Sequence, residues 1–142
     1  VGCGETCRVQ GNEIVPAGGC ARWYSPLCEA EMRVEHWSNA VEQGAAAAAR
    51  LLDGASAPAF SHMPYFWSDQ YDRKFQCTGR VRADDAFEVV HGALERPSFA
   101  AMYVRDGRVS GVLTSNAPAV FLRARKVLAQ SLPVAEARQA LA

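Results

Sequence analysis

The residues from Arg33 to Gly54 carry the strongest pattern in the sequence. Asp53-Gly54 supplies a helix end, because glycine readily takes the left-handed conformation just past the last turn. The free N–H groups of the first turn, next to Glu35, form a potential site for an anion or a dipole. We therefore predict a long helix with one apolar face to be covered. The apolar side chains recur every three or four positions, as on one face of an α-helix: Val34, Trp37, Val41, Ala45, Ala48 and Leu52.

Composition excludes several classes of function. The chain has 142 residues, enough for one compact domain or for a piece of a larger protein, and its 49% hydrophobic content is ordinary for a folded chain. Fifteen basic residues balance fifteen acidic ones, so the net charge favours neither nucleic acid nor a membrane surface as a partner. No apolar run approaches the roughly 20 residues of a membrane span, and no secretory signal opens the sequence. We therefore expect a cytoplasmic protein.

The five cysteines do not form a recognisable framework. Their odd number argues against a fully paired set of disulfides, and their spacings lack the paired C-x-x-C units of common zinc sites. We predict small, partly buried thiols and no metal site.

The composition changes after residue 54. Residues 55–64 are rich in Ala, Ser and Pro, which marks a connector between a first part (1–53) and a second part (54–142). In the first part, residues 13–17 read as an apolar strand that runs into a glycine pair. The second part predicts an α+β fold, in which an antiparallel sheet has flanking helices. Its expected elements are strands at 65–68, 74–78, 86–91, 100–105 and 109–115, a hairpin turn at Asp106-Gly107, and a helix over 118–132 capped by Asn116.

Three segments carry a family resemblance. They are Val15-Pro-Ala-Gly-Gly-Cys-Ala-Arg-Trp23, Met32-Arg-Val-Glu-His-Trp-Ser-Asn-Ala-Val-Glu-Gln-Gly44 and Pro64-Tyr-Phe-Trp-Ser-Asp-Gln70. Together they resemble the C-terminal third of the FAD-dependent, NADH-using ferredoxin reductases that serve bacterial oxygenases and cytochromes P450. The resemblance implies that residues 1–53 are the end of an FAD-binding domain and that 54–142 are the C-terminal domain. It implies FAD, NADH and a ferredoxin partner only for a full-length reductase.

The resemblance also places individual residues. The family reads Ala-Gly-Asp-x-Ala where this chain has Gly18 and Gly19, and its aspartate binds the ribityl chain of FAD. The turn of Glu35, His36 and Trp37 matches the helix start that faces the flavin, and Trp67 matches an aromatic residue beside the flavin and nicotinamide rings. Neither dinucleotide-binding G-x-G-x-x-G fingerprint occurs in the sequence. We therefore expect that this chain alone holds neither FAD nor NADH and transfers no hydride.

Two classes of function remain open. In the first, the chain completes the flavin site and shapes the redox-partner surface of a reductase, with Arg123, Arg125 and Lys126 as a basic docking face. In the second, it is a repurposed cofactor-independent enzyme, such as a cyclase or isomerase, or a binding protein for a hydrophobic small molecule in the former flavin pocket. The candidate catalytic residues are then Glu35, His36, Trp67 and Asp69, with His62 and Tyr71 as further polar groups. A homodimer is one way to cover the apolar helix face.

Overall fold

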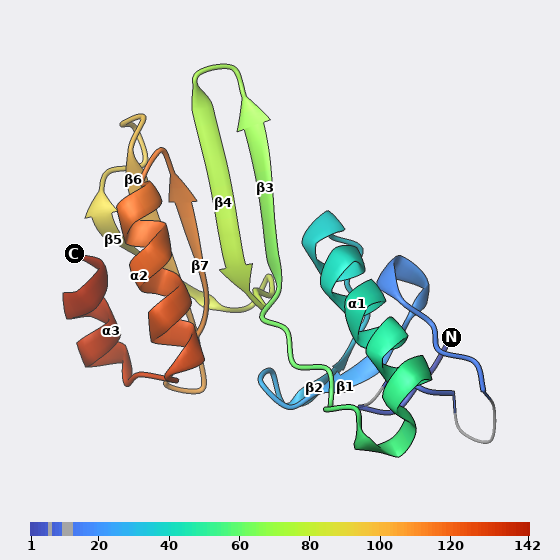
Figure 1. The fold of residues 1–142 in the computed structure, drawn as a ribbon. Helices are drawn as coiled ribbons and strands as arrows, with labels where there is room; N and C mark the ends of the chain where they lie inside the picture. Colours follow the sequence, from blue (N-terminus) through green and yellow to red (C-terminus); the bar gives the residue numbers. More distant parts are fainter. Residues whose placement is uncertain (6, 10–12) are drawn as a thin grey trace. The chain divides into compact units, whose positions relative to one another are not determined.

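The computed structural model describes residues 1–5, 7–9 and 13–142. The chain divides into two compact units, Val1–Pro64 and Tyr65–Ala142, which are described separately (Figure 1).

The first unit is built around one long helix. A short 3₁₀ turn, η1 (Gly18–Cys20), precedes the antiparallel strand pair β1 (Trp23–Ser25) and β2 (Ala30–Met32). The helix α1 (Trp37–Asp53) follows and leads into a second 3₁₀ turn, η2 (Gly54–Ser56). The Trp23 and Phe60 rings, 5.4 Å apart, lie in a small core. Its buried members are Cys7, Trp23, Met32, Val34 and Phe60.

The strand predicted at residues 13–17 is not formed. Residues 13–17 belong to no strand, and the Val9 N–H donates a hydrogen bond to the Ile14 carbonyl at 3.0 Å. Pro16 also lacks an N–H for a ladder. The regular strand instead follows the glycine pair, as β1.

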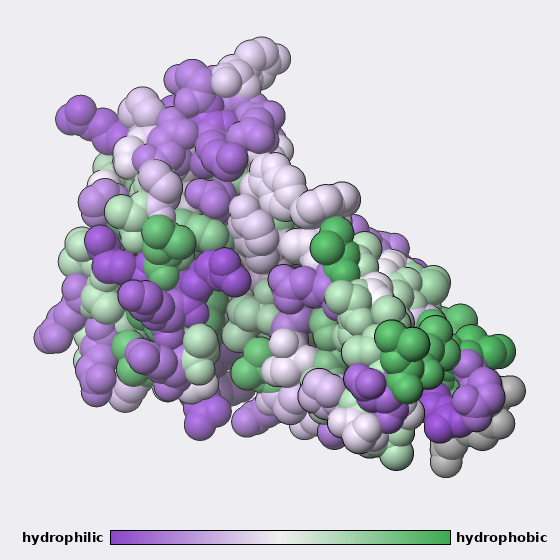
Figure 2. Space-filling model, in the orientation of Figure 1, coloured by the Kyte–Doolittle hydropathy of each residue, from purple (hydrophilic) through white to green (hydrophobic). Residues whose placement is uncertain are grey.

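The helix α1 ends as predicted but turns its faces the other way. Gly54 has a φ of +57°, and its N–H closes the last turn on the Arg50 carbonyl. The buried positions are Ser38, Asn39, Gln43 and Ala47, most of them polar. Within the helix, the predicted apolar stripe points outward: Trp37 is 69% exposed, Val41 51% and Leu52 85%. Val34, which the prediction placed on the same stripe, lies before the start of the helix and is buried. Figure 2 shows apolar side chains at the surface of this unit.

The second unit is the α+β fold that the sequence predicts. Its sheet has the order β3-β4-β7-β6-β5, with every neighbouring pair antiparallel. The helices pack on the sheet through a core that includes Met102, Val112, Val120 and Val127 (Figure 1). The elements are β3 (Tyr65–Gln70), β4 (Arg73–Gly79), β5 (Ala86–Gly92), β6 (Phe99–Arg105), β7 (Arg108–Ser115), α2 (Pro118–Ala129) and α3 (Val134–Leu141).

The hairpin between β6 and β7 follows from the residues of its turn. Asp106 and Gly107 have φ values of +51° and +73°, which the two-residue turn between β6 and β7 requires.

Asn116 does not cap α2, so that prediction was wrong. The residue before the helix is Ala117, and Asn116 instead accepts the Lys74 N–H at 2.7 Å and donates to the Asp72 carbonyl at 2.8 Å. Its side chain therefore ties the β3–β4 hairpin to the start of α2.

Candidate functional site

The glycine turn lies against the first half of α1. Gly18 has a φ of +72°, and its N–H donates to the Gln43 Oε1 at 2.8 Å. A Cβ added at Gly19 would lie 3.4 Å from the Glu35 Cγ, which is ordinary van der Waals contact. The turn therefore has room for a Cβ at Gly19, where the sequence provides none.

A polar seam holds this turn to the helix. The Gln43 Oε1 also accepts a hydrogen bond from the Asn39 Nδ2, at 3.3 Å, and the Gln43 Nε2 donates to the Cys7 sulfur at 3.3 Å. Asn39 donates in turn to the Val34 carbonyl at 3.1 Å. Since buried amides are costly unless they are hydrogen-bonded, these contacts fix the Gly18 turn on α1.

The three residues at the helix start have different surroundings. The Glu35 carboxylate is exposed and pairs with Arg33 at 3.0 Å. His36 is the residue before the helix and makes no side-chain cap, while Trp37 is largely exposed. Burial, with a smaller contribution from nearby His62, lowers the pKa of His36, so the neutral imidazole is favoured at pH 7. A catalytic role for Glu35 and His36 stays a prediction.

An acid–histidine contact lies close by and was not predicted. His62 is buried, its Nδ1 lies 2.6 Å from the Glu42 Oε2, and its ring stacks on Phe60 with centroids 5.9 Å apart. The His62 Nε2 is buried and has no hydrogen-bond partner among the described residues. Sequence reasoning named His62 as a polar candidate but gave no signal that Glu42, twenty residues earlier, would face it.

The remaining predicted residues belong to the second unit. Trp67 on β3 is 39% exposed and stacks on Tyr65 at 5.5 Å, and Tyr65 packs on Phe121 of α2 at 5.2 Å. Asp69 is exposed near the hairpin tip, 3.8 Å from the Lys74 ammonium. Gly18, Gly19 and the helix start lie in the first unit, so the expectation that they meet Trp67 and Asp69 in one pocket stays a prediction.

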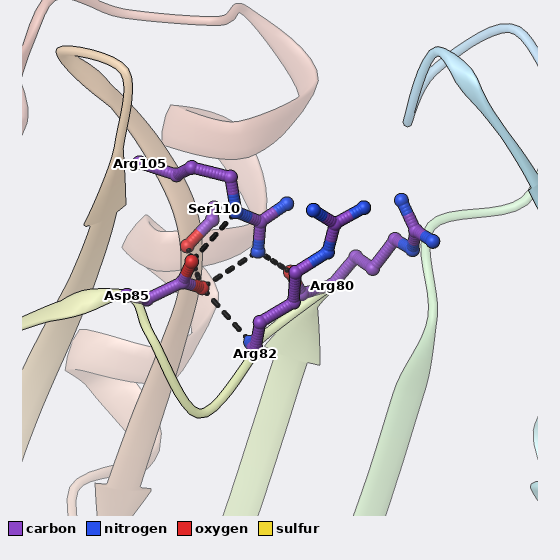
Figure 3. A network of polar contacts seen from close by, with 5 residues as sticks. All are labelled: Arg80, Arg82, Asp85, Arg105 and Ser110. Atoms are coloured by element: carbon purple, nitrogen blue, oxygen red, sulfur yellow. Dashed lines mark hydrogen bonds and ion pairs between the residues drawn. The ribbon is translucent and has the colours of Figure 1, made fainter.

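A buried carboxylate, Asp85, is held by several donors in the second unit. The Asp85 side chain is fully buried and accepts hydrogen bonds from the Arg105 Nε (2.6 Å) and Nη2 (2.7 Å), the Ser110 hydroxyl (2.7 Å) and the Arg82 N–H (2.9 Å) (Figure 3). Arg105 also donates to the Arg80 carbonyl at 2.8 Å. These donors, Arg105 first, lower the pKa of Asp85 to about 2. The cluster is a brace between the β4–β5 connection and the β6–β7 hairpin, and no sequence signal indicated it.

Comparison with known proteins gives this arrangement a family. The model of the reductase C-terminal family matches residues 65–141, more than half of the chain. The chain belongs to this family. It is also 35% identical to the putidaredoxin reductase of Pseudomonas putida over 121 residues, which cover 85% of this chain and 28% of that protein. Rhodocoxin reductase of Rhodococcus erythropolis is 32% identical over 130 residues, or 92% of this chain and 30% of the relative.

Solved structures agree with these sequences. The covalent putidaredoxin reductase–putidaredoxin complex matches with a TM-score of 0.83 and 32% identity, over 94% of this chain and 31% of that one. A ferredoxin reductase from Rhodopseudomonas palustris matches with a TM-score of 0.85 and 29% identity, over 97% and 34%. The resemblance to oxygenase-system ferredoxin reductases is therefore confirmed. The chain spans less than a third of the length of the curated relatives named above.

The family implies FAD, and the glycine turn allows a test of the fit. Gly19 offers no side-chain acceptor for a ribityl hydroxyl, and the neighbouring Gly18 N–H is already bonded to Gln43. The turn therefore lacks the carboxylate that the family resemblance places beside the ribityl chain. Among the described residues, no cluster of three His, Cys, Asp or Glu is arranged to hold a metal ion. In the same part of the chain, no helix is both long and apolar enough to cross a membrane.

Proposed function

We propose that residues 1–142 act as the C-terminal region of an FAD-dependent NADH:ferredoxin reductase, and that this chain alone neither holds FAD or NADH nor transfers hydride. The observation that carries the proposal is the outward apolar stripe of α1, with Trp37, Val41 and Leu52 exposed while amides face the core. Exposed apolar stripes of this kind mark surfaces that another body covers. In a full reductase, the rest of the FAD-binding domain would be that body.

The chain would then supply part of the walls of a redox site in the full reductase. FAD and NADH supply hydride chemistry in the full-length family. The residues here would provide the aromatic surface of Trp67 and the start of α1, whose peptide dipoles favour negative charge. The missing dinucleotide fingerprints and the side-chain-free Gly19 explain why the isolated chain would not bind the cofactor.

Cofactor retention tests this proposal. The purified chain is incubated with FAD, passed through a desalting column and scanned for the two flavin absorption bands, and NADH oxidation is followed with ferricyanide as acceptor. We expect no retained flavin and no NADH oxidation above the rate without protein. The matched variant is Gly19→Asp, whose Cβ would make only ordinary van der Waals contact at this turn. One added hydrogen bond is worth about 1 kcal/mol, so this variant should also retain no FAD through the column. A yellow wild-type protein after desalting would overturn the proposal.

The same proposal predicts a surface that binds the ferredoxin. Arg123, Arg125 and Lys126 are exposed on α2, a basic face that would dock an acidic ferredoxin. We expect weak, salt-sensitive binding of an acidic ferredoxin, weakened by Arg125→Glu and unchanged by Arg82→Glu. Fluorescence anisotropy at two ionic strengths measures it, and equal effects of the two variants would contradict the assignment.

A second candidate is supported by the half-exposed aromatic rings. Trp37 is 69% exposed, and Trp67, which stacks on Tyr65, is 39% exposed; a repurposed enzyme or binding protein would use such rings to contact a hydrophobic small molecule. Quenching of tryptophan fluorescence by such a molecule, retained in Trp37→Phe but lost in Trp67→Phe, would favour this second function. Equal quenching in both variants would indicate non-specific adsorption.

A further inference from the structure

Three aromatic rings of the second unit follow one another from the core to the surface. The Phe121 ring of α2 is 4% exposed, and the Tyr65 ring of β3 packs on it with centroids 5.2 Å apart. The Trp67 ring stacks on Tyr65 at 5.5 Å, with an angle of 25° between the two planes. Since Trp67 is 39% exposed, Tyr65 connects a half-exposed ring to a buried one.

The geometry of β3 brings Tyr65 and Trp67 together. Residues two apart in a strand lie on the same face of the sheet, and the contact between Tyr65 and Phe121 identifies this as the face on which α2 packs. Phe66 lies between the two in sequence and therefore points to the opposite face, although it is also 39% exposed. The two strand neighbours of similar exposure thus differ in what holds them.

A side chain of β4 holds the hydroxyl end of Tyr65. Gln76 is the cross-strand partner of Trp67, and its Nε2 donates to the Tyr65 hydroxyl at 3.3 Å. The Tyr65 ring is therefore held both by Phe121 of α2 and by Gln76 of β4. Trp67 consequently stacks on a ring that is itself fixed in place.

We propose that Tyr65 is a positioning residue, which fixes the plane of the Trp67 indole so that β3 presents a preorganised aromatic surface to a planar ring ligand. The inference rests on the proposed function for the use of this surface, since there Trp67 contributes to a redox site. A ring that is already ordered loses little conformational freedom when a ligand stacks on it. The stabilisation typical of an aromatic pair corresponds to roughly 2- to 13-fold in the ratio of the stacked Trp67 rotamer to the others.

The order of the Trp67 ring in the full chain tests this proposal without a cofactor or a partner. The three tryptophans are replaced by 5-fluorotryptophan, and their ¹⁹F resonances are assigned with Trp37→Phe and Trp67→Phe. Relaxation of ¹⁹F reports ring motion on the picosecond-to-nanosecond timescale, with the buried Trp23 as an internal reference. We expect the Trp67 ring to be nearly as ordered as that of Trp23 in wild type, and to lose this order in Tyr65→Leu. Three-bond couplings across the Cα–Cβ bond should show the ratio of its preferred rotamer to the others falling roughly 2- to 13-fold.

Matched variants separate positioning from a general loosening of the sheet. Tyr65→Phe keeps the ring and loses only the hydroxyl that Gln76 binds, so it should retain most of the order of Trp67. Phe66→Leu removes an equally exposed ring from the opposite face and should leave Trp67 unchanged. Phe121→Leu should loosen Trp67 less than Tyr65→Leu, and the double variant should behave as Tyr65→Leu alone, because Phe121 acts through Tyr65.

Two results would contradict the proposal. One is a wild-type Trp67 ring that is clearly more mobile than that of Trp23, which needs no variant and so does not depend on how the variants fold. The other is an effect of Phe66→Leu on Trp67 as large as that of Tyr65→Leu, with amide exchange in β6 and β7 showing that both sheets are intact. Since FAD, NADH and ferredoxin are absent from these samples, either result is distinct from failure of the proposed function, which the desalting experiment measures.

Discussion

Replacing Asp85 with asparagine tests how the second unit is held together. The side chain keeps its shape, but the carboxylate that accepts four hydrogen bonds becomes an amide, and half of that amide is a donor facing Arg105. A pKa lowered from 3.8 to about 2 corresponds to at most ~2.5 kcal/mol at neutral pH. Since the Arg105 side chain is 23% exposed and partly screened by water, we expect ~1 to 2 kcal/mol from this term.

The direction of the pH dependence follows from the same shift. A carboxyl whose pKa is lower in the folded state contributes its full stability above the unfolded pKa of 3.8 and loses it as the pH falls through about 2. Wild type and Asp85→Asn should therefore differ most above pH 5 and converge as the pH approaches 2. Ser110→Ala removes one neutral donor and should cost ~1 kcal/mol.

Thermal unfolding followed by circular dichroism measures these differences, with amide hydrogen exchange in β6 and β7 assigning the transition to this unit. Near neutral pH we expect Asp85→Asn to lower Tm by roughly 4 to 16 °C, at about 4–8 °C per kcal/mol. Asp84→Asn is the matched control, because Asp84 is exposed next to the same site, and it should change stability by less than ~0.5 kcal/mol. A gap that stays constant from pH 5 to pH 2, or an equal effect of Asp84→Asn, would refute the reasoning.

Three further changes test the local structure. Gly79→Ala should destabilise the protein by more than ~2 kcal/mol, because a Cβ there would lie 2.4 Å from the Ser110 carbonyl oxygen at a φ of +99°. Gly107→Ala, at a φ of +73° in open space, should cost only ~1 kcal/mol. Equal losses in the free energy of unfolding, measured in urea, would contradict this. Asn116→Ala should cost ~1 to 2 kcal/mol through its bonds to Lys74 and Asp72, and should speed amide exchange at Lys74 while leaving α3 unaffected. His62→Phe should retain the stacking on Phe60 and cost less than His62→Ala, for which we expect ~2 to 3 kcal/mol by chemical denaturation; the reverse order would show that the Glu42 contact outweighs packing.

Predictions succeeded where a short stretch of sequence determines the geometry. The Asp106-Gly107 turn needs two residues that tolerate positive φ, and the flanking alternation then sets β6 and β7. The buried face of α2 likewise follows from its spacing, with Val120, Phe121, Ala124, Val127 and Leu128 all inward. These features depend on neighbours within one or two turns of the chain.

Contacts between distant residues were not predictable in this way. Asp85 is held by residues 20 and 25 positions later, and Glu42 meets His62 across 20 positions. Asn116 illustrates the competition: as a sequence it reads as a helix cap, but two backbone groups on the β3–β4 hairpin, more than 40 residues earlier, claim its side chain. A single sequence shows which groups can hydrogen-bond, and only the fold decides which of them meet.

The orientation of α1 joins the fold to the proposed function. The spacing of apolar residues in the sequence identifies the stripe of Trp37, Val41 and Leu52 but does not say what covers it. Within this unit, the glycine turn and Cys7 bind the opposite face of the helix, which carries the amide side chains. Gln43 is well satisfied there, so rotating the helix to bury the stripe would break its two hydrogen bonds to the Gly18 N–H and the Cys7 sulfur and strand a buried amide. Each large apolar side chain left in water forgoes ~1.5 to 3 kcal/mol of burial. A helix whose polar contacts fix its apolar face outward is suited to a surface that a further protein body completes, which is the role proposed for it in a full reductase.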